Sequence, residues 1–165
     1  MSIAIEKGVA TQVYRVFIKA TPQAIWDAIT KPEWVEKYGY NARAEFVLRP
    51  GGSYRAFASA PMKAHGAPDV IIVGEVIEAD PPRRLVQTWH PVWDPELSAE
   101  EPTRLTYELQ EQPGGITRLT LVHEVGGAAI TAKMVSGEAE NAGGGWSWVL
   151  SDLKTLLETG RTMGQ

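Results

Sequence analysis

The sequence predicts an α+β domain: an antiparallel sheet of about six or seven strands, two short helices after the first strand and a long C-terminal helix. Three observations predict this class. Short runs of alternating or β-branched residues recur between Pro and Gly turns, which is typical of antiparallel strands. One stripe of apolar residues with helical spacing occupies 144–159. The sequence of 165 residues has no internal repeat, and its composition does not change along the chain. We therefore expect a single domain over 1–165 with its core in 11–160.

A strand followed by two short helices is expected at the N-terminus. The run TQVYRVFIKA at 11–20 alternates between polar and apolar residues and therefore predicts a strand with one apolar face. Thr21 offers a hydroxyl N-cap, and Pro22 occupies a helical position that tolerates a missing N–H. Pro32 begins a second short helix, expected to run through Tyr38.

The middle of the chain is expected to form the remaining strands. Their runs are rich in β-branched and alternating apolar residues and are bounded by Pro or Gly. The expected strands cover 44–48, 53–58, 70–79, 83–90, 103–110 and 116–124. The connections at 59–69 and 91–102 contain several prolines, so we expect them to be loops.

The last segment is the long helix. Its apolar side chains recur every three or four residues, which places them on one face. Gly160 is suited to end this helix, because glycine accepts the left-handed conformation that a helix end often needs. The expected apolar face comprises Trp146, Val149, Leu150, Leu153, Leu156 and Leu157.

Composition and charge exclude several classes of function. With no cysteine, the chain has no disulfide framework, thiolate nucleophile or iron–sulfur cluster. A net charge of −4 argues against broad nucleic-acid binding, which needs a surplus of Lys and Arg. No apolar run approaches a membrane span and the N-terminus lacks a secretory signal, so we expect a cytoplasmic protein without membrane contact. The three histidines lack metal-ligand spacing, so neither a metal nor a cofactor is expected.

Five segments along the chain carry a family resemblance when they are taken together. They are TPQAIWDAITKPE (21–33), LRPGG (48–52), GEVIEADPPRRLVQTW (74–89), TRLTLVHE (117–124) and GGGWSWVLSDLKTLLETG (143–160). In this order they resemble the START-related SRPBCC superfamily, in the branch similar to the activator of the heat-shock protein 90 ATPase. The resemblance covers about 11–160 and implies the helix-grip fold, in which a curved sheet wraps around the C-terminal helix. Relatives of this kind include binders of apolar small molecules and polyketide cyclases, so the fold alone does not choose a function.

A curved sheet that grips one helix is expected to leave a ligand cavity between them, typically about 300 to 1,000 Å³ and mostly apolar. Strand parity and the helical stripe predict its lining. The residues are Tyr54, Ile72, Val76, Leu85, Gln87, Trp89, Leu105, Tyr107, Leu121, His123, Trp146, Val149, Leu150 and Leu153. In the alternative interpretation these side chains fill a solid core. The polar members need hydrogen-bond partners if they are buried, and a ligand or ordered water would supply them.

The sequence leaves three functions open. The first is a carrier or sensor that binds a small, largely apolar molecule. The second is an enzyme of the cyclase or hydrolase type, for which His123 and Tyr107 are the best acid–base candidates, no other catalytic residue being assigned. The third is a module that interacts with a chaperone.

Two tryptophans and a glycine run have more than one interpretation. Trp93 follows Trp89 at the entrance of the long loop, where it suits either a lid over a ligand or a loop anchor. Trp148 is expected on the exposed side of the last helix, where it would mark a partner surface and leaves a homodimer open. The run Gly143, Gly144 and Gly145 suits a mobile hinge before the last helix or close backbone packing against the first helices.

Overall fold

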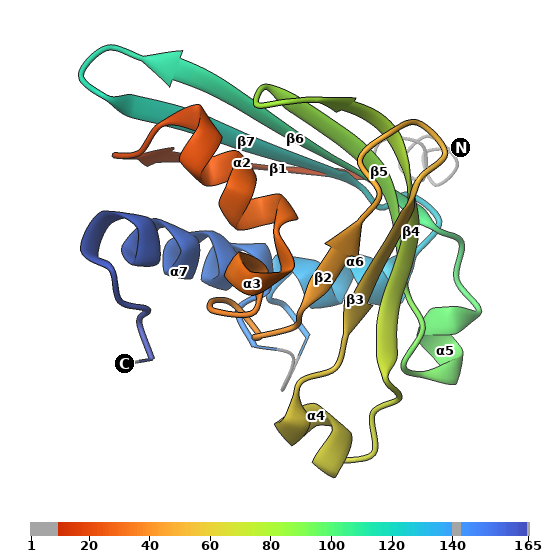
Figure 1. Cartoon of the computed structure of the whole chain (residues 1–165). Coiled ribbons are helices and arrows are strands. Elements are labelled where there is room, and N and C mark those ends of the chain that lie inside the picture. Colours follow the sequence, from red (N-terminus) through yellow and green to blue (C-terminus); the bar gives the residue numbers. More distant parts are fainter. Residues whose placement is uncertain (1–9, 140–142, 165) are drawn as a thin grey trace.

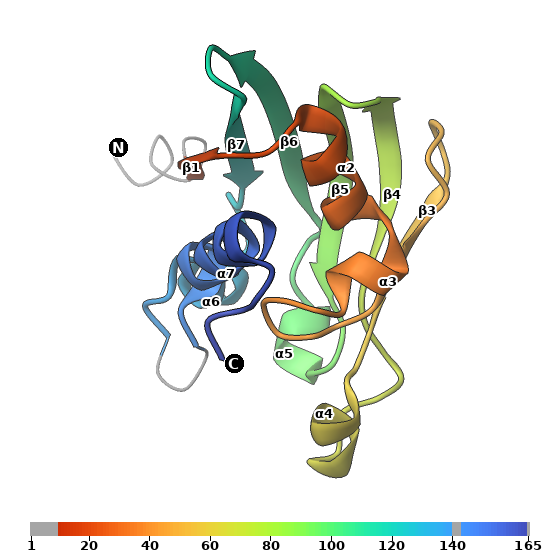
Figure 2. The same ribbon diagram turned by 60° about the vertical axis from the view of Figure 1, so that its left-hand side comes forward.

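The computed structural model describes residues 10–139 and 143–164. Its strands form a seven-stranded antiparallel sheet in the order β1-β7-β6-β5-β4-β3-β2 (Figure 1). The sheet curves around α2, α3, α6 and α7, which all lie on the same side of it (Figures 1 and 2). The α+β helix-grip fold expected from the sequence is therefore confirmed.

The elements follow the expected order with three additions. The strands are β1 (Thr11–Ile18), β2 (Ala44–Phe46), β3 (Ser53–Phe57), β4 (Val70–Asp80), β5 (Arg84–Pro91), β6 (Thr103–Gln112) and β7 (Ile116–Glu124). The helices are α2 (Pro22–Thr30), α3 (Pro32–Val35), α4 (Ala60–Ala64), α5 (Pro95–Ser98), α6 (Ala129–Ser136) and α7 (Gly145–Thr159).

Local capping explains two helices that the sequence analysis assigned to loops. The Ser59 hydroxyl accepts a hydrogen bond from the Met62 amide at 3.4 Å and begins α4. The Asp94 carboxylate accepts from the amides of Glu96 and Leu97 and begins α5. In both segments a proline stands in the first turn, where it favours a helix rather than preventing one. The prediction of loops over 59–69 and 91–102 is thus wrong for these two short stretches.

The helix α6 was not expected at all, because its N-terminus is capped from a distance. No side chain of its own N-terminal residues caps it. Instead the Glu100 carboxylate accepts hydrogen bonds from the amides of Ile130 and Thr131 at 2.7 and 2.9 Å. A cap that comes from thirty residues earlier in the chain leaves no local signal in the sequence.

The helix α7 packs against the edge strand β1 and engages two backbone groups at the end of that strand. The Lys154 ammonium donates to the Phe17 carbonyl at 2.7 Å, and the Glu158 carboxylate accepts from the Lys19 amide at 2.7 Å. These contacts occupy polar groups that an edge strand would otherwise offer to another chain. They also fix α7 relative to the sheet.

The packed core occupies one part of the space between sheet and helices. The helix α2 contacts both β6 and α7 there. Its Ile25 and Trp26 are buried in one cluster with Leu85, Leu105 and Leu153. The remainder of the space, nearer β2 to β5, is not filled in this way. None of the helices in the described part of the chain has the length and hydropathy needed to span a bilayer.

Candidate functional site: an apolar cavity

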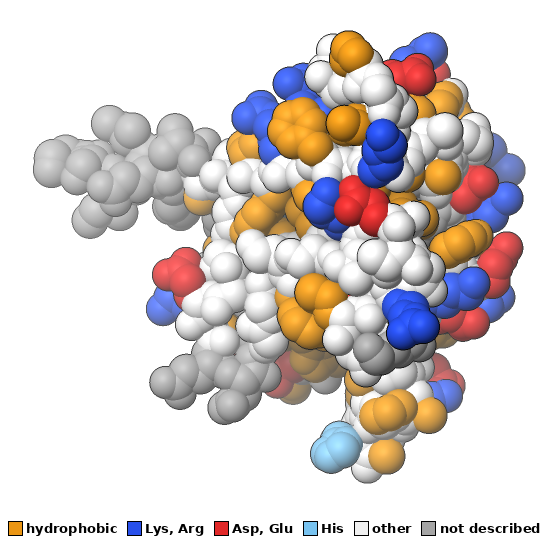
Figure 3. All heavy atoms as spheres, turned by 90° about the vertical axis from the view of Figure 1, so that its left-hand side faces the viewer, with side chains coloured by type: hydrophobic (Ala, Val, Ile, Leu, Met, Phe, Trp, Pro, Cys, Tyr) orange, Lys and Arg blue, Asp and Glu red, His pale blue; other side chains and the backbone are white. Residues whose placement is uncertain are grey.

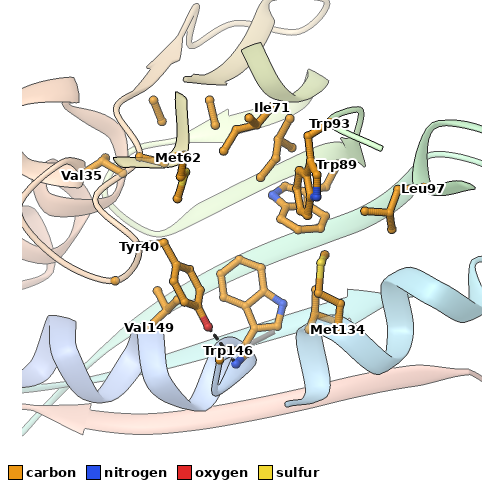
Figure 4. A pocket seen from close by; sticks show the side chains of 18 of the residues that line it. Val35, Tyr40, Met62, Ile71, Trp89, Trp93, Leu97, Met134, Trp146 and Val149 are labelled. Carbon is orange, nitrogen blue, oxygen red and sulfur yellow. Dashed lines mark hydrogen bonds between the residues drawn. The ribbon is translucent and has the colours of Figure 1, made fainter. Parts of the chain in front are cut away.

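A cavity of about 1090 Å³ opens between the sheet and the helices α3 to α7. Its wall is mostly apolar and contains many aromatic rings. Trp89 and Trp93 lie on one side of it, while Tyr40, Trp146 and Met134 lie on the opposite side (Figure 4). The cavity reaches the surface, because Tyr40, Trp93 and Ile130 of its wall are each about two-fifths exposed, at 39, 37 and 42%.

Six of the side chains expected from the sequence line this cavity, and the other eight do not. The lining residues are Tyr54, Ile72, Trp89, Tyr107, Trp146 and Val149. The others, Val76, Leu85, Gln87, Leu105, Leu121, His123, Leu150 and Leu153, are buried elsewhere in the interior. Strand parity identified inward faces, but it did not show which of them are covered by other side chains of the core, as His123 is by Trp89 and Trp146.

The sequence analysis missed a large share of the wall, since this share comes from two elements that were expected to be loops and from α6, which was not expected. Met62 and Leu97 are contributed by α4 and α5, and Met134 and Val135 by α6. Capping signals at Ser59 and Asp94 are visible in the sequence and mark the first two of these helices. No comparable signal marks α6.

The start of α7 closes against the segment that follows α3. The Gly145 amide donates to the Tyr40 hydroxyl at 3.1 Å, as the dashed line in Figure 4 shows. The Gly39 amide in turn donates to the Asp152 carboxylate at 2.9 Å. Gly145 itself has a φ of +62°, and a Cβ on it would lie 2.1 Å from the Val135 carbonyl oxygen. A close backbone approach is therefore found at Gly145, but its partner is α6 and not, as the sequence predicted, one of the first helices.

His123 is fully buried behind the aromatic wall, and both of its ring nitrogens are engaged. The Trp146 indole N–H donates to Nδ1 at 2.9 Å, so the ring proton resides on Nε2. Nε2 lies 2.7 Å from the Thr103 hydroxyl, which donates onward to the Trp89 carbonyl at 2.7 Å. Burial lowers the pKa of His123 to about 3, which keeps the ring neutral. This arrangement supports Trp89 and Trp146 and leaves no free nitrogen for a substrate.

Three tyrosines of the cavity wall interact with one another electrostatically. They are Tyr38 after α3, Tyr54 on β3 and Tyr107 on β6. Burial raises the pKa of all three phenols, so each remains protonated. Tyr107 is thus a hydrogen-bond donor at neutral pH and not a base.

The wall carries little charge. His65 and Lys133 are the basic groups among its described residues, both with exposed side chains, and none of the described lining residues carries a carboxylate. Within the described ranges, no group of three His, Asp or Glu side chains is placed to hold a metal ion. Elsewhere in the interior, Gln87 donates to the Thr88 carbonyl at 3.2 Å, and its Oε1 has no partner among the described residues.

Trp148 lies on the outer side of α7, as expected. It is 39% exposed, and its indole N–H donates to the Gly39 carbonyl at 3.3 Å. Hydrophobic side chains on the face that carries α2 and the end of α7 form separate groups with acidic and basic side chains between them (Figure 3). The homodimer contact considered for Trp148 stays a prediction.

The fold is shared with solved proteins of low sequence identity. Protein MLL2253 from Mesorhizobium loti is 22% identical, with a TM-score of 0.66 over 90% of this chain and 96% of that one. CalU16 from Micromonospora echinospora is 20% identical, with a TM-score of 0.62 over 90% and 76%. PFC0360w, described as an HSP90 activator from Plasmodium falciparum, is 19% identical, with a TM-score of 0.63 over 90% and 96%. The Aha1 dimer from Colwellia psychrerythraea is also 19% identical, with a TM-score of 0.63 over 91% and 97%.

At these identities the solved structures support the fold alone. No significant match is found among proteins of curated function. The model of one protein family, described as activator of Hsp90 ATPase homolog 1-like protein, matches residues 19–158. This match spans both short helices, the strands β2 to β7 and nearly all of α7. The chain therefore belongs to the activator of Hsp90 ATPase homolog 1-like family. This family is part of the SRPBCC superfamily, which the five sequence segments resemble.

Proposed function

We propose that this protein binds a small, largely apolar molecule in the cavity between its sheet and its helices, as a carrier or sensor. The observation that carries the proposal is the cavity itself, about 1090 Å³ in volume, with an aromatic and aliphatic wall that reaches the surface. Transfer of apolar ligand surface from water into such a site is favourable by about 25 cal/mol for each Å². A wall with so few charged groups selects for ligands of matching polarity.

The geometry does not favour the alternative of acid–base catalysis by His123 and Tyr107. Both ring nitrogens of His123 are hydrogen-bonded, and its side chain is outside the cavity wall. Tyr107 keeps its proton, because burial raises its pKa. The third function, interaction with a chaperone, stays a prediction that co-purification with a chaperone would support.

Native mass spectrometry of freshly purified protein tests the proposal first. We expect a bound molecule that dissociates on denaturation, or uptake of uncharged polycyclic compounds by the empty protein, followed as quenching of tryptophan emission. Trp89, Trp93 and Trp146 all belong to the wall, so a ligand that enters contacts an intrinsic fluorophore.

Two variants locate the binding. Met134→Trp adds a bulky ring to the cavity wall and is expected to weaken binding at least tenfold. Val13→Trp adds the same ring at a 51% exposed position on β1 and serves as the control with unchanged affinity. Calorimetry measures both without interference from the new tryptophan. A protein that purifies empty and ignores a diverse apolar panel, or equal binding by both variants, would contradict the proposal.

A further inference from the structure

The hydroxyl groups of the cavity wall differ in whether they have an acceptor. The Tyr38 hydroxyl donates to the Ala28 carbonyl at 2.9 Å. The hydroxyls of Tyr54 and Tyr107 donate to no acceptor among the described residues. Tyr54 is 8% exposed, and its hydroxyl interacts with the Trp89 side chain, whose indole is a donor only. The protons of both hydroxyls therefore remain available to a partner inside the cavity.

The two hydroxyls come from different strands, β3 and β6, and belong to side chains that line the same cavity. Tyr107 stands opposite Leu85 and Leu121 in the sheet, so its side chain is on the same inward face as these two buried residues, and it lines the cavity. Tyr54 stands on β3, on the same concave surface of the sheet. Burial, and to a smaller extent the Tyr54 phenol, raises the pKa of Tyr107. Neither hydroxyl oxygen is among the described buried polar atoms that lack a partner, so both are open to the cavity, where an oxygen atom of water or of a ligand accepts from them.

We propose that Tyr54 and Tyr107 form a subsite for an uncharged acceptor oxygen at the inner end of the ligand, with a carbonyl group as the chemistry that fits. This inference rests on the proposed function and adds the polarity of the ligand to it. A carbonyl oxygen has two lone pairs and accepts from both hydroxyls. The rings around it, among them Phe46, whose centroid lies 4.7 Å from that of Tyr54, would contact a flat apolar body.

The subsite excludes an ionised head group for an electrostatic reason. A buried carboxylate needs a cation to offset the loss of its hydration. The basic groups of the wall, His65 and Lys133, have exposed side chains and belong to the segments after α4 and in α6, which form the rim. The raised pKa values of Tyr54 and Tyr107 agree with a site that holds neutral donors next to a neutral acceptor.

Three probes of nearly the same shape test the subsite. 1-Acetylpyrene carries a carbonyl oxygen, 1-isopropenylpyrene replaces that oxygen by a methylene group, and 1-pyrenecarboxylate replaces the acetyl group by a charged one. Dissociation constants are measured by quenching of tryptophan emission. The native protein is expected to bind the ketone roughly tenfold more tightly than the alkene, because each of two hydrogen bonds contributes a factor of a few, and to bind the carboxylate most weakly.

Phenylalanine variants assign the preference to the two hydroxyls. In Tyr54→Phe and Tyr107→Phe the ratio of ketone to alkene affinity should fall several-fold, and in the double variant it should approach one. Tyr38→Phe is the matched control, since its hydroxyl already has the Ala28 carbonyl as acceptor, and it should keep the ratio of the native protein. The alkene itself reports on the cavity of each variant, so a folding defect lowers both affinities and leaves the ratio interpretable.

The outcomes separate this inference from the function on which it rests. Equal binding of ketone and alkene by the native protein, an unchanged ratio in the double variant, or tightest binding of the carboxylate would overturn the subsite while the cavity function stands. Failure of the native protein to bind any of the three probes would overturn both.

Discussion

His123 was one of the two candidates for acid–base catalysis, but in the structure it has a structural role. Its ring links the Trp146 indole to Thr103 and thereby to the Trp89 backbone. Two tryptophans of the cavity wall are thus held by one neutral imidazole. A histidine with a free ring nitrogen in this position would suit acid–base catalysis. Both ring nitrogens of His123 are hydrogen-bonded, so neither is available to a substrate.

We predict that His123 makes the fold sensitive to mild acid. The unfolded chain takes up a proton near the ordinary histidine pKa of 6.5, whereas the native protein does so only near 3. Between these values the unfolded state binds more protons, so the free energy of unfolding falls as the pH falls, by about 1.4 kcal/mol per pH unit. Urea denaturation at pH 6 and pH 5 measures the change.

His123→Gln provides the control for this prediction, because an amide can accept from Trp146 and donate to Thr103 without titrating. All carboxylates are common to both proteins, so the difference between their pH dependences isolates the imidazole. Identical losses of stability in the two proteins would contradict a neutral, depressed His123.

At the scale of elements, the junction of α6 and α7 sets one wall of the cavity. Gly145, the first residue of α7, lies against the last turn of α6, and only a hydrogen fits between it and the Val135 carbonyl. Its positive φ adds a second reason for glycine. The helices therefore meet at a distance that any side chain would increase.

Gly145→Ala is expected to destabilise the protein by at least about 3 kcal/mol, from a strained φ and a backbone clash together. Gly160→Ala is the matched comparison: its φ of +81° is also left-handed, but no atom lies within 4 Å of the added Cβ. A cost of about 1 kcal/mol is expected there. Denaturant unfolding of both variants decides the matter, and similar costs would mean that the contact with α6 contributes little.

The sequence predicted α2 and α7 but not α6, because only the first two have local signals at their ends. Thr21 accepts from the Ala24 amide at 3.1 Å, as its position before Pro22 predicted. The helix α7 has a regular apolar face and ends at Gly160, also as predicted. By contrast α6 depends on the Glu100 carboxylate at its N-terminus. Local signals were sufficient for the first two elements and absent for the third.

For the whole molecule, the uneven filling of the space between sheet and helices is the decisive property. Side chains of α2 complete the core at one end, while α4, α5 and α6 surround an opening at the other. Helices with few packing contacts in the protein without ligand are expected to gain the most local stability when a ligand in the cavity contacts them.

Hydrogen exchange of the native protein tests whether a ligand stabilises the helices around the cavity more than the rest of the protein. With 1-acetylpyrene at a hundred times its dissociation constant, amides of α4 and α6 that exchange by opening of the binding site should slow by up to roughly a hundredfold. The turn between β6 and β7, which has no residue in the cavity wall, should exchange at its original rate. Equal protection of both regions would indicate a global effect and contradict binding at this site.

The sequence by itself determined the class of fold, the family and the inward faces of the strands, because these depend on local periodicity, turn residues and caps. It also identified Tyr54, Trp89, Tyr107 and Trp146 as inward-facing. Only the tertiary structure decided which inward faces border the cavity and which are buried in the packed core, and that His123 lies between two tryptophans and a threonine. The physical reason is that periodicity records which side of an element is apolar, whereas the filling of the space it faces depends on elements far away in the chain.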